Sequence, residues 1–189
     1  MSDQESALLR VAAAFDRRHT PYMVIGGLAN VVWGEPRATL DVDVTVWVDE
    51  PELAGVVADL CAAFRSMVED PLGFVKETRV LPLESGEGVR LDVIFGLLHF
   101  EREAIARAVA IEVAGAPVRF CTAEDLILMK IISDRTQDLA DAEGVALRRM
   151  AELDLGYLEP RVRELAELLE NPEIMRRWSA WRASAAGRR

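Results

Sequence analysis

The alternation of hydrophobic and polar residues divides the chain into two parts. Up to about residue 121, short β-branched runs alternate with amphipathic helical patterns, and every later pattern is helical. The expected helices cover residues 4–18, 28–33, 51–67, 100–108, 122–132, 137–153, 160–170 and 173–185, and the expected strands cover 22–25, 39–48, 78–83, 89–95, 110–113 and 117–120. The fold class is therefore α/β (α+β), with a mixed sheet flanked by helices over residues 1–121 and a helical bundle over residues 122–189.

Residues 39–48 give the clearest strand pattern. One face of this strand is aliphatic, and the other carries Thr39, Asp41 and Asp43. Aspartate is depleted in strands, and two carboxylates at positions i and i+2 lie about 7 Å apart and repel each other. A divalent cation offsets that repulsion, and Mg²⁺ prefers carboxylate oxygens. The alternative is a solvated strand face whose acids only add solubility.

Two further features extend this candidate site. Asp92 is the one acid among the apolar residues of strand 89–95, so on a neighbouring strand it would complete a three-carboxylate cluster able to hold two metal ions. Gly26 and Gly27 lie between strand 22–25 and the next helix, where missing Cβ atoms let a phosphate approach the helix N-terminus. A glycine pair alone is more often a tight turn. Together, these residues suit a nucleoside triphosphate with Mg²⁺.

Composition and charge narrow the class of protein. The 189 residues are 51% hydrophobic, which excludes wholesale disorder. The acidic start and the lack of a long apolar run indicate a soluble cytoplasmic protein without a membrane partner. Two cysteines are too few for a disulfide framework, and two histidines are too few for a histidine metal cluster. The net charge of −10 has the wrong sign for a general nucleic-acid binder. A local basic patch would need the C-terminal arginines, which are Arg148, Arg149, Arg161, Arg163, Arg176, Arg177, Arg182, Arg188 and Arg189.

The chain resembles a known superfamily at three motifs. Ile25-Gly26-Gly27, the run Arg-Ala-Thr-Leu-Asp-Val-Asp at 37–43, and Leu91-Asp92-Val93 resemble the nucleotidyltransferase fold of the DNA polymerase β superfamily. The middle motif is similar to AbiEii-family toxins, including MenT-type toxins. A second patch supports that branch, with Asp125, Lys130 and Arg135 followed by an Asp-x-x-Asp helix at 138–141. The resemblance implies a catalytic domain over residues 1–121 and a C-terminal helical region, 122–189, that packs on the active site.

That resemblance implies magnesium-dependent transfer of a nucleoside monophosphate from an NTP to an acceptor hydroxyl. Asp41, Asp43 and Asp92 would hold one or two Mg²⁺ ions, and Asp92 would bind metal, act as general base, or both. The implied NTP-binding residues are Gly26, Gly27, Arg37, Lys130 and Asp138, with Lys130 also counted as catalytic.

Three of these residues have structural alternatives. Lys130 lies in an apolar helix, where its ammonium needs an anion, either the triphosphate or Asp138 or Asp141. Arg37 would hold the triphosphate or pair with Glu35. Asp138 would complement the dipole at the start of the helix near residue 137.

The acceptor and the regulation rest on the resemblance. MenT-type toxins imply the 3′ end of tRNA as acceptor, a toxin–antitoxin system with a cognate antitoxin, and silencing by phosphorylation of Thr39 by a kinase or by bound nucleotide. Thr39 has an ordinary alternative as a strand residue. The competing functions are a small-molecule nucleotidyltransferase of the aminoglycoside type and a catalytically idle binding module, against which the three carboxylates argue.

Overall fold

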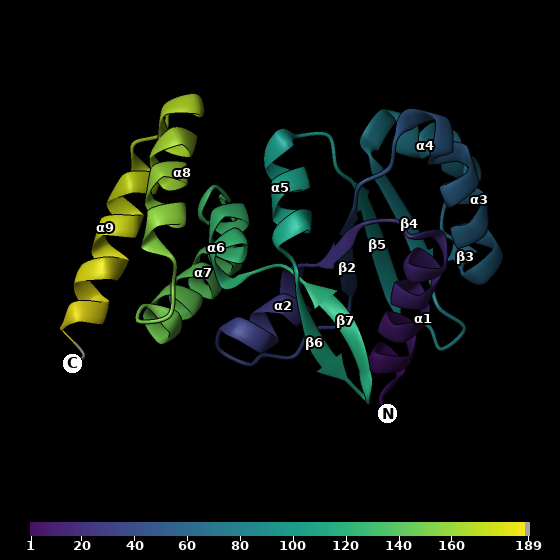
Figure 1. The fold of residues 1–189 in the computed structure, drawn as a ribbon, viewed down its shortest axis with the longest axis horizontal. Helices are drawn as coiled ribbons and strands as arrows, with labels where there is room; N and C mark the ends of the chain where they lie inside the picture. Colours follow the sequence, from purple (N-terminus) through teal and green to yellow (C-terminus); the bar gives the residue numbers. More distant parts are fainter. Residues whose placement is uncertain (188–189) are drawn as a thin grey trace. The chain divides into compact units, whose positions relative to one another are not determined.

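The computed structural model describes residues 1–187 and forms two compact units (Figure 1). Met1–Leu28 and Ala38–Cys121 make the first unit, and Ala29–Arg37 joins the chain from Thr122 onward in the second. The chain changes units at Thr122, where the pattern turns wholly helical. Residues 29–37 were expected in the first part. Arg188 and Arg189 of the expected basic patch, and the end of region 122–189, lie outside the described residues.

Within residues 1–187, the first unit holds a seven-stranded mixed sheet in the order β3-β4-β5-β2-β1-β7-β6. β2 runs antiparallel to β1 and parallel to β5, and β1 runs parallel to β7. The strands are β1 (Tyr22–Val24), β2 (Val42–Val46), β3 (Arg65–Ser66), β4 (Val80–Glu84), β5 (Arg90–Phe95), β6 (Val109–Val113) and β7 (Ala116–Phe120). The expected mixed α/β class with a mixed sheet is confirmed.

Helices accompany the sheet and build the second unit. The first unit has α1 (Asp3–Arg18), the start of α2 (Gly26–Trp33), the 3₁₀ turn η1 (Glu50–Glu52), α3 (Leu53–Ala63), α4 (Pro71–Thr78) and α5 (His99–Arg107). The second unit has α6 (Ala123–Ile131), α7 (Thr136–Arg149), α8 (Leu155–Leu168) and α9 (Glu173–Ala186), with α8 beside α9 (Figure 1). Among residues 1–187, no helix has both the length and the apolar character needed to cross a bilayer.

Burial alternates along β5 and along β2 from Val42 to Val44, and it shows the direction of the polar side chains there. Val42, Val44 and Val46 of β2 are fully buried, as are the alternate apolar residues Leu91, Val93 and Phe95 of β5. The intervening side chains, including Asp43 and Asp92, therefore point to the opposite face of the sheet. Both aspartates are half-buried.

β2 is shorter than expected, which corrects the placement of Thr39 and Asp41. The strand begins at Val42, and Leu40, expected on the aliphatic face, is 81% exposed. The reason is the lack of a pairing partner, since β1 ends at Val24 opposite Val44 and the ladder with β5 begins at Val42 opposite Leu91. Thr39 and Asp41 therefore lie in the segment that enters β2.

Candidate active site

Asp43 and Asp92 are register partners on adjacent parallel strands. Neighbouring strands lie about 4.8 Å apart, so the two carboxylates share one small area of the sheet. Asp41 is exposed two residues earlier, where the chain enters β2. Because like charges on one face repel, the cluster favours a bound cation.

The arginine next to this cluster, Arg90, was not among the expected site residues. Its Nε lies 3.2 and 3.3 Å from the two carboxylate oxygens of Asp92, and its Nη2 lies 3.1 Å from Oδ2. The hydrogen bond to Asp92 is the largest cause that raises the pKa of Arg90, and the charges of Asp92, Asp41 and Asp43 act in the same direction. Arg90 precedes Asp92 by two residues on the same strand, so strand alternation puts both side chains on one face. This alternation is the sequence signal that could have identified Arg90 as a site residue.

Gly26 makes room for Asp43 at the start of α2. Its backbone has φ +65°, and a Cβ there would lie 2.0 Å from Oδ2 of Asp43. Both the left-handed backbone and the lack of space therefore require glycine. The carboxylate of Asp43 thus lies at the first turn of a helix, where the partial positive charge stabilises an anion.

Gly27 makes room for the side chain of Thr39. A Cβ on Gly27 would lie 2.3 Å from the hydroxyl oxygen of Thr39. The Gln4 side chain also donates a hydrogen bond of 2.6 Å to the Thr39 carbonyl oxygen and so holds the segment that leads to Asp41. The glycine pair therefore brings the start of α2, Thr39 and Asp43 together.

The chemistry of this cluster fits a divalent cation. Asp41, Asp43 and Asp92, on adjoining segments, supply the hard oxygen donors that Mg²⁺ prefers. Among residues 1–187, no three acidic, histidine or cysteine side chains converge in a metal-binding group. Arg90 contacts Asp92, and Asp43 lies against Gly26.

Three other expected site residues, Arg37, Lys130 and Asp138, form an ionic network with Asp141 in the second unit. The Lys130 ammonium lies 2.7 Å from Asp138 Oδ1 and 2.8 Å from Asp141 Oδ2. Arg37 approaches both oxygens of Asp141, with Nε at 3.1 Å and Nη2 at 3.0 Å. The side chains of Lys130 and Asp141 are only 7% and 3% exposed, so each charge is neutralised by its neighbours.

Hydrogen bonding sets the ionisation of the two acids. Burial by itself raises the pKa of Asp141, but hydrogen bonds from Arg37, Lys130 and Gln137 outweigh it and lower the pKa to about 2. For Asp138, burial is likewise outweighed by the hydrogen bond and charge of Lys130, and the pKa is lowered. Both carboxylates are therefore charged at neutral pH.

The network bears on the alternatives for its members. Lys130 has Asp138 and Asp141 as anionic partners, the structural alternative foreseen for it. Arg37 pairs with Asp141, whereas Glu35 pairs with Arg148 at 3.2 Å. Binding of triphosphate by Arg37, Lys130 and Asp138 stays a prediction.

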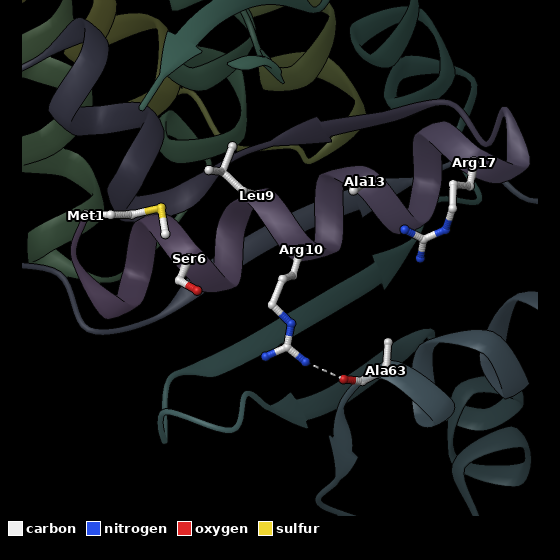
Figure 2. A pocket seen from close by; sticks show the side chains of 7 residues that line it. All are labelled: Met1, Ser6, Leu9, Arg10, Ala13, Arg17 and Ala63. Atoms are coloured by element: carbon white, nitrogen blue, oxygen red, sulfur yellow. Dashed lines mark hydrogen bonds between the residues drawn. The ribbon is translucent and has the colours of Figure 1, made fainter. Parts of the chain in front are cut away.

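A hollow of about 320 Å³ on α1 carries none of these groups (Figure 2). Arg10 lies across it and donates a hydrogen bond of 2.7 Å to the Ala63 carbonyl oxygen. The lining residues are Met1, Ser6, Leu9, Arg10, Ala13, Arg17 and Ala63. It contains no carboxylate, and we assign it no part in the chemistry.

Comparison with known proteins identifies the class. The mixed sheet with its flanking helices has the nucleotidyltransferase fold. The chain belongs to the family described as nucleotidyltransferase of unknown function (DUF6036), which it matches over residues 5–184. The protein is therefore an enzyme of the nucleotidyltransferase type. The narrower likeness to AbiEii-family and MenT-type toxins stays a prediction.

Three solved structures have similar folds. The antibiotic-resistance factor ANT(2'')-Ia is 20% identical, with 90% of this chain and 96% of that chain covered and a TM-score of 0.59. An antigenic nucleotidyltransferase-like protein from Paracoccidioides brasiliensis is 16% identical over 93% and 92%, with a TM-score of 0.54. The lincosamide antibiotic adenylyltransferase LnuA, with lincomycin bound, is 15% identical over 77% and 96%, with a TM-score of 0.52. No curated protein matches the sequence.

Proposed function

We propose that this protein transfers a nucleoside monophosphate from an NTP to an acceptor hydroxyl with the help of Mg²⁺. The observation that carries the proposal is the register of Asp43 and Asp92 on adjacent parallel strands, with Asp43 against the glycine that opens α2. This arrangement supplies carboxylates for a cation and a helix start for a phosphate within one small area.

Each residue of the cluster has a role in this reaction. Asp41, Asp43 and Asp92 would hold the cation, which would neutralise phosphate charge. Gly26 and Gly27 hold Asp43 and Thr39 close against the start of α2, whose N–H groups would bind a phosphate beside them. Asp92 takes the proton of the acceptor hydroxyl, whose oxygen then attacks the α-phosphorus. The new P–O bond forms as the bond to the β-phosphate breaks, and pyrophosphate leaves.

We favour a small polar molecule as the acceptor. A nucleic-acid acceptor needs free basic side chains, but most described arginines of the expected basic patch contact groups of the protein itself. Arg148 pairs with Glu35, Arg149 with Glu152, Arg176 with Glu173 and Arg182 with Glu159, and Arg161 lies over the Tyr157 ring. The net charge of −10 also opposes a phosphate backbone. Two fold neighbours are antibiotic-resistance or antibiotic-modifying proteins, which is consistent with this choice.

The second candidate is a toxin that modifies the 3′ end of tRNA and is controlled by an antitoxin. It is supported by the motif at residues 37–43 and by the Lys130 and Asp138 patch, through the likeness to AbiEii-family and MenT-type proteins.

One assay separates the two acceptors. The protein is incubated with Mg²⁺ and each labelled NTP, together with a panel of aminoglycosides and lincosamides or with total RNA. A small-molecule enzyme labels a compound of the panel, whereas the toxin labels RNA of tRNA length. Asp43→Asn should abolish either signal, and a signal that persists in Asp43→Asn would reject the proposed site.

A further inference from the structure

We propose that Arg90 is an internal counter-cation of the carboxylate cluster, which a divalent metal ion must displace from Asp92. The inference rests on the proposed function, because it takes Asp41, Asp43 and Asp92 as the metal site. It assigns Arg90 the task of neutralising Asp92 before the metal and the nucleotide arrive.

The contacts of Arg90 give it this position. Its guanidinium approaches both oxygens of Asp92, with Nε 3.2 and 3.3 Å from them and Nη2 3.1 Å from Oδ2. Its side chain is 53% exposed whereas that of Asp92 is 21% exposed, so the guanidinium covers the carboxylate from the solvent side. An exposed side chain on a flexible stem can move away without disturbing the sheet.

The acid on the neighbouring strand does not draw Arg90 away from Asp92. Its register partner on β4 is Glu84, which is another anion on the neighbouring strand. Arg65 of β3 already holds Glu84 with a hydrogen bond of 2.6 Å. The two arginines are thus divided between two acids, Arg65 with Glu84 and Arg90 with Asp92.

Competition follows from the shared oxygens. A metal ion and a guanidinium that contacts both oxygens of Asp92 compete for the same lone pairs. Displacing Arg90 from an exposed pair should therefore weaken binding of the bare metal about two- to fivefold. A triphosphate that arrives with the metal offers the displaced guanidinium a new anion. Metal and nucleotide should then bind together more readily than the metal alone.

The test is the affinity of the whole chain for Mn²⁺ without nucleotide, measured by electron paramagnetic resonance, in Arg90→Gln and in Arg65→Gln. Arg65 is the matched control, because it is an exposed arginine on the same sheet whose removal changes the net charge equally but leaves Asp92 covered. We expect Arg90→Gln to bind Mn²⁺ about two- to fivefold more tightly than Arg65→Gln. Equal or weaker binding by Arg90→Gln would overturn the inference.

A second measurement tests the link to nucleotide. With an unreactive NTP analogue present, Mn²⁺ affinity should rise by a larger factor in the unmodified protein than in Arg90→Gln, since only the former can transfer the guanidinium to the phosphates. An equal rise in both proteins would contradict that step.

Failure of the metal site itself gives a different result. If Asp43→Asn and Asp92→Asn bind Mn²⁺ as well as the unmodified protein, then the proposed function fails at its site and the Arg90 inference falls with it. If both substitutions abolish binding while Arg90→Gln matches Arg65→Gln, only the role of Arg90 is wrong. Thermal unfolding of each variant confirms that it is folded before Mn²⁺ is added.

Discussion

At the scale of single residues, Gly26 connects backbone conformation to the candidate chemistry. Its φ of +65° and the position of Asp43 Oδ2, 2.0 Å from where a Cβ would lie, leave no room for a side chain. The position of the Asp43 carboxylate in the proposed metal site therefore depends on Gly26, which has no side chain.

Gly26→Ala should therefore impair both stability and chemistry. We expect a loss of about 1–3 kcal/mol in the free energy of unfolding, because the backbone is strained, and a loss of transfer activity, because Asp43 is displaced. Urea unfolding and an NTP transfer assay measure the two effects. Gly86→Ala is the control, since a Cβ there meets open space. If the two variants behaved alike, Gly26 would be an ordinary turn residue.

Asp141 makes stability depend on pH. Its pKa is about 2 in the folded protein against an ordinary value of 3.8, so its stabilising effect is present above pH 3.8 and is lost as the pH falls towards 2. The full effect is about 2 kcal/mol. Between pH 5 and pH 3, Asp141→Asn should lose less unfolding free energy than the unmodified protein, while the exposed control Asp134→Asn should keep the original slope. The same slope in all three proteins would refute the assignment.

Thr39 offers a test of the proposed phosphorylation. Its hydroxyl oxygen lies against Gly27, and a phosphate would add about −1.5 to −2 charges beside the entry to Asp41. Thr39→Glu should abolish NTP transfer, whereas Thr39→Val, which keeps the shape, should retain most of it. The protein would be produced with and without the product of the gene next to its own in the genome. Intact mass and peptide mapping of the two preparations would reveal the modification. A protein that is never modified and an active Glu variant would make Thr39 purely structural.

At the scale of elements, the alternation of hydrophobic and polar residues predicted the features that depend on one chain segment alone. It identified the strands of Asp43 and Asp92 and the side of its own strand on which each aspartate lies, because side-chain direction follows from a period of two. The pairing of the two strands is seen only in the folded sheet. It extended β2 too far, because the end of a strand depends on its partners, and β1 stops at Val24. The ion pair of Arg37 and Asp141 joins residues 104 positions apart and has no local signal.

The start of α8 shows another limit of sequence patterns. The helix was expected over residues 160–170, but α8 begins at Leu155, and the Asp154 side chain just before it accepts a hydrogen bond from the Tyr157 N–H. This N-cap fixes the start of the helix, and Pro160 lies inside it. The earlier turn brings Tyr157 to α6, where its hydroxyl donates a hydrogen bond of 2.6 Å to Asp125.

Tyr157→Phe should loosen the contact between α6 and α8. Asp125 is fully buried and would lose one of its donors, which costs about 1–3 kcal/mol in the free energy of unfolding. Tyr22→Phe is the control, because the hydroxyl of Tyr22 accepts only a long 3.4 Å hydrogen bond from the Arg119 N–H. Urea unfolding compares the two, and an equal loss would show that the Asp125 contact is not special.

At the scale of the whole molecule, fold and class could be read from the sequence, but the acceptor could not. The resemblance of the glycine pair and the three aspartates to motifs of the DNA polymerase β superfamily predicted the nucleotidyltransferase fold, and the family match over residues 5–184 confirms the class. Which arginines remain free for an acceptor depends on pairs such as Arg148 with Glu35, formed only in the folded protein. The charge of −10 alone could not decide this.

The central claim is that Asp43 and Asp92 form a metal-dependent nucleotidyl-transfer site. The most direct test is pyrophosphate release from each NTP, with a mixture of antibiotics and total RNA as acceptors, in the unmodified protein, Asp43→Asn and Asp92→Asn. We predict release that requires both Mg²⁺ and acceptor and that falls by about two orders of magnitude or more in either variant, while both variants stay folded. Undiminished release in either folded variant, or release that persists in excess EDTA, would contradict the claim.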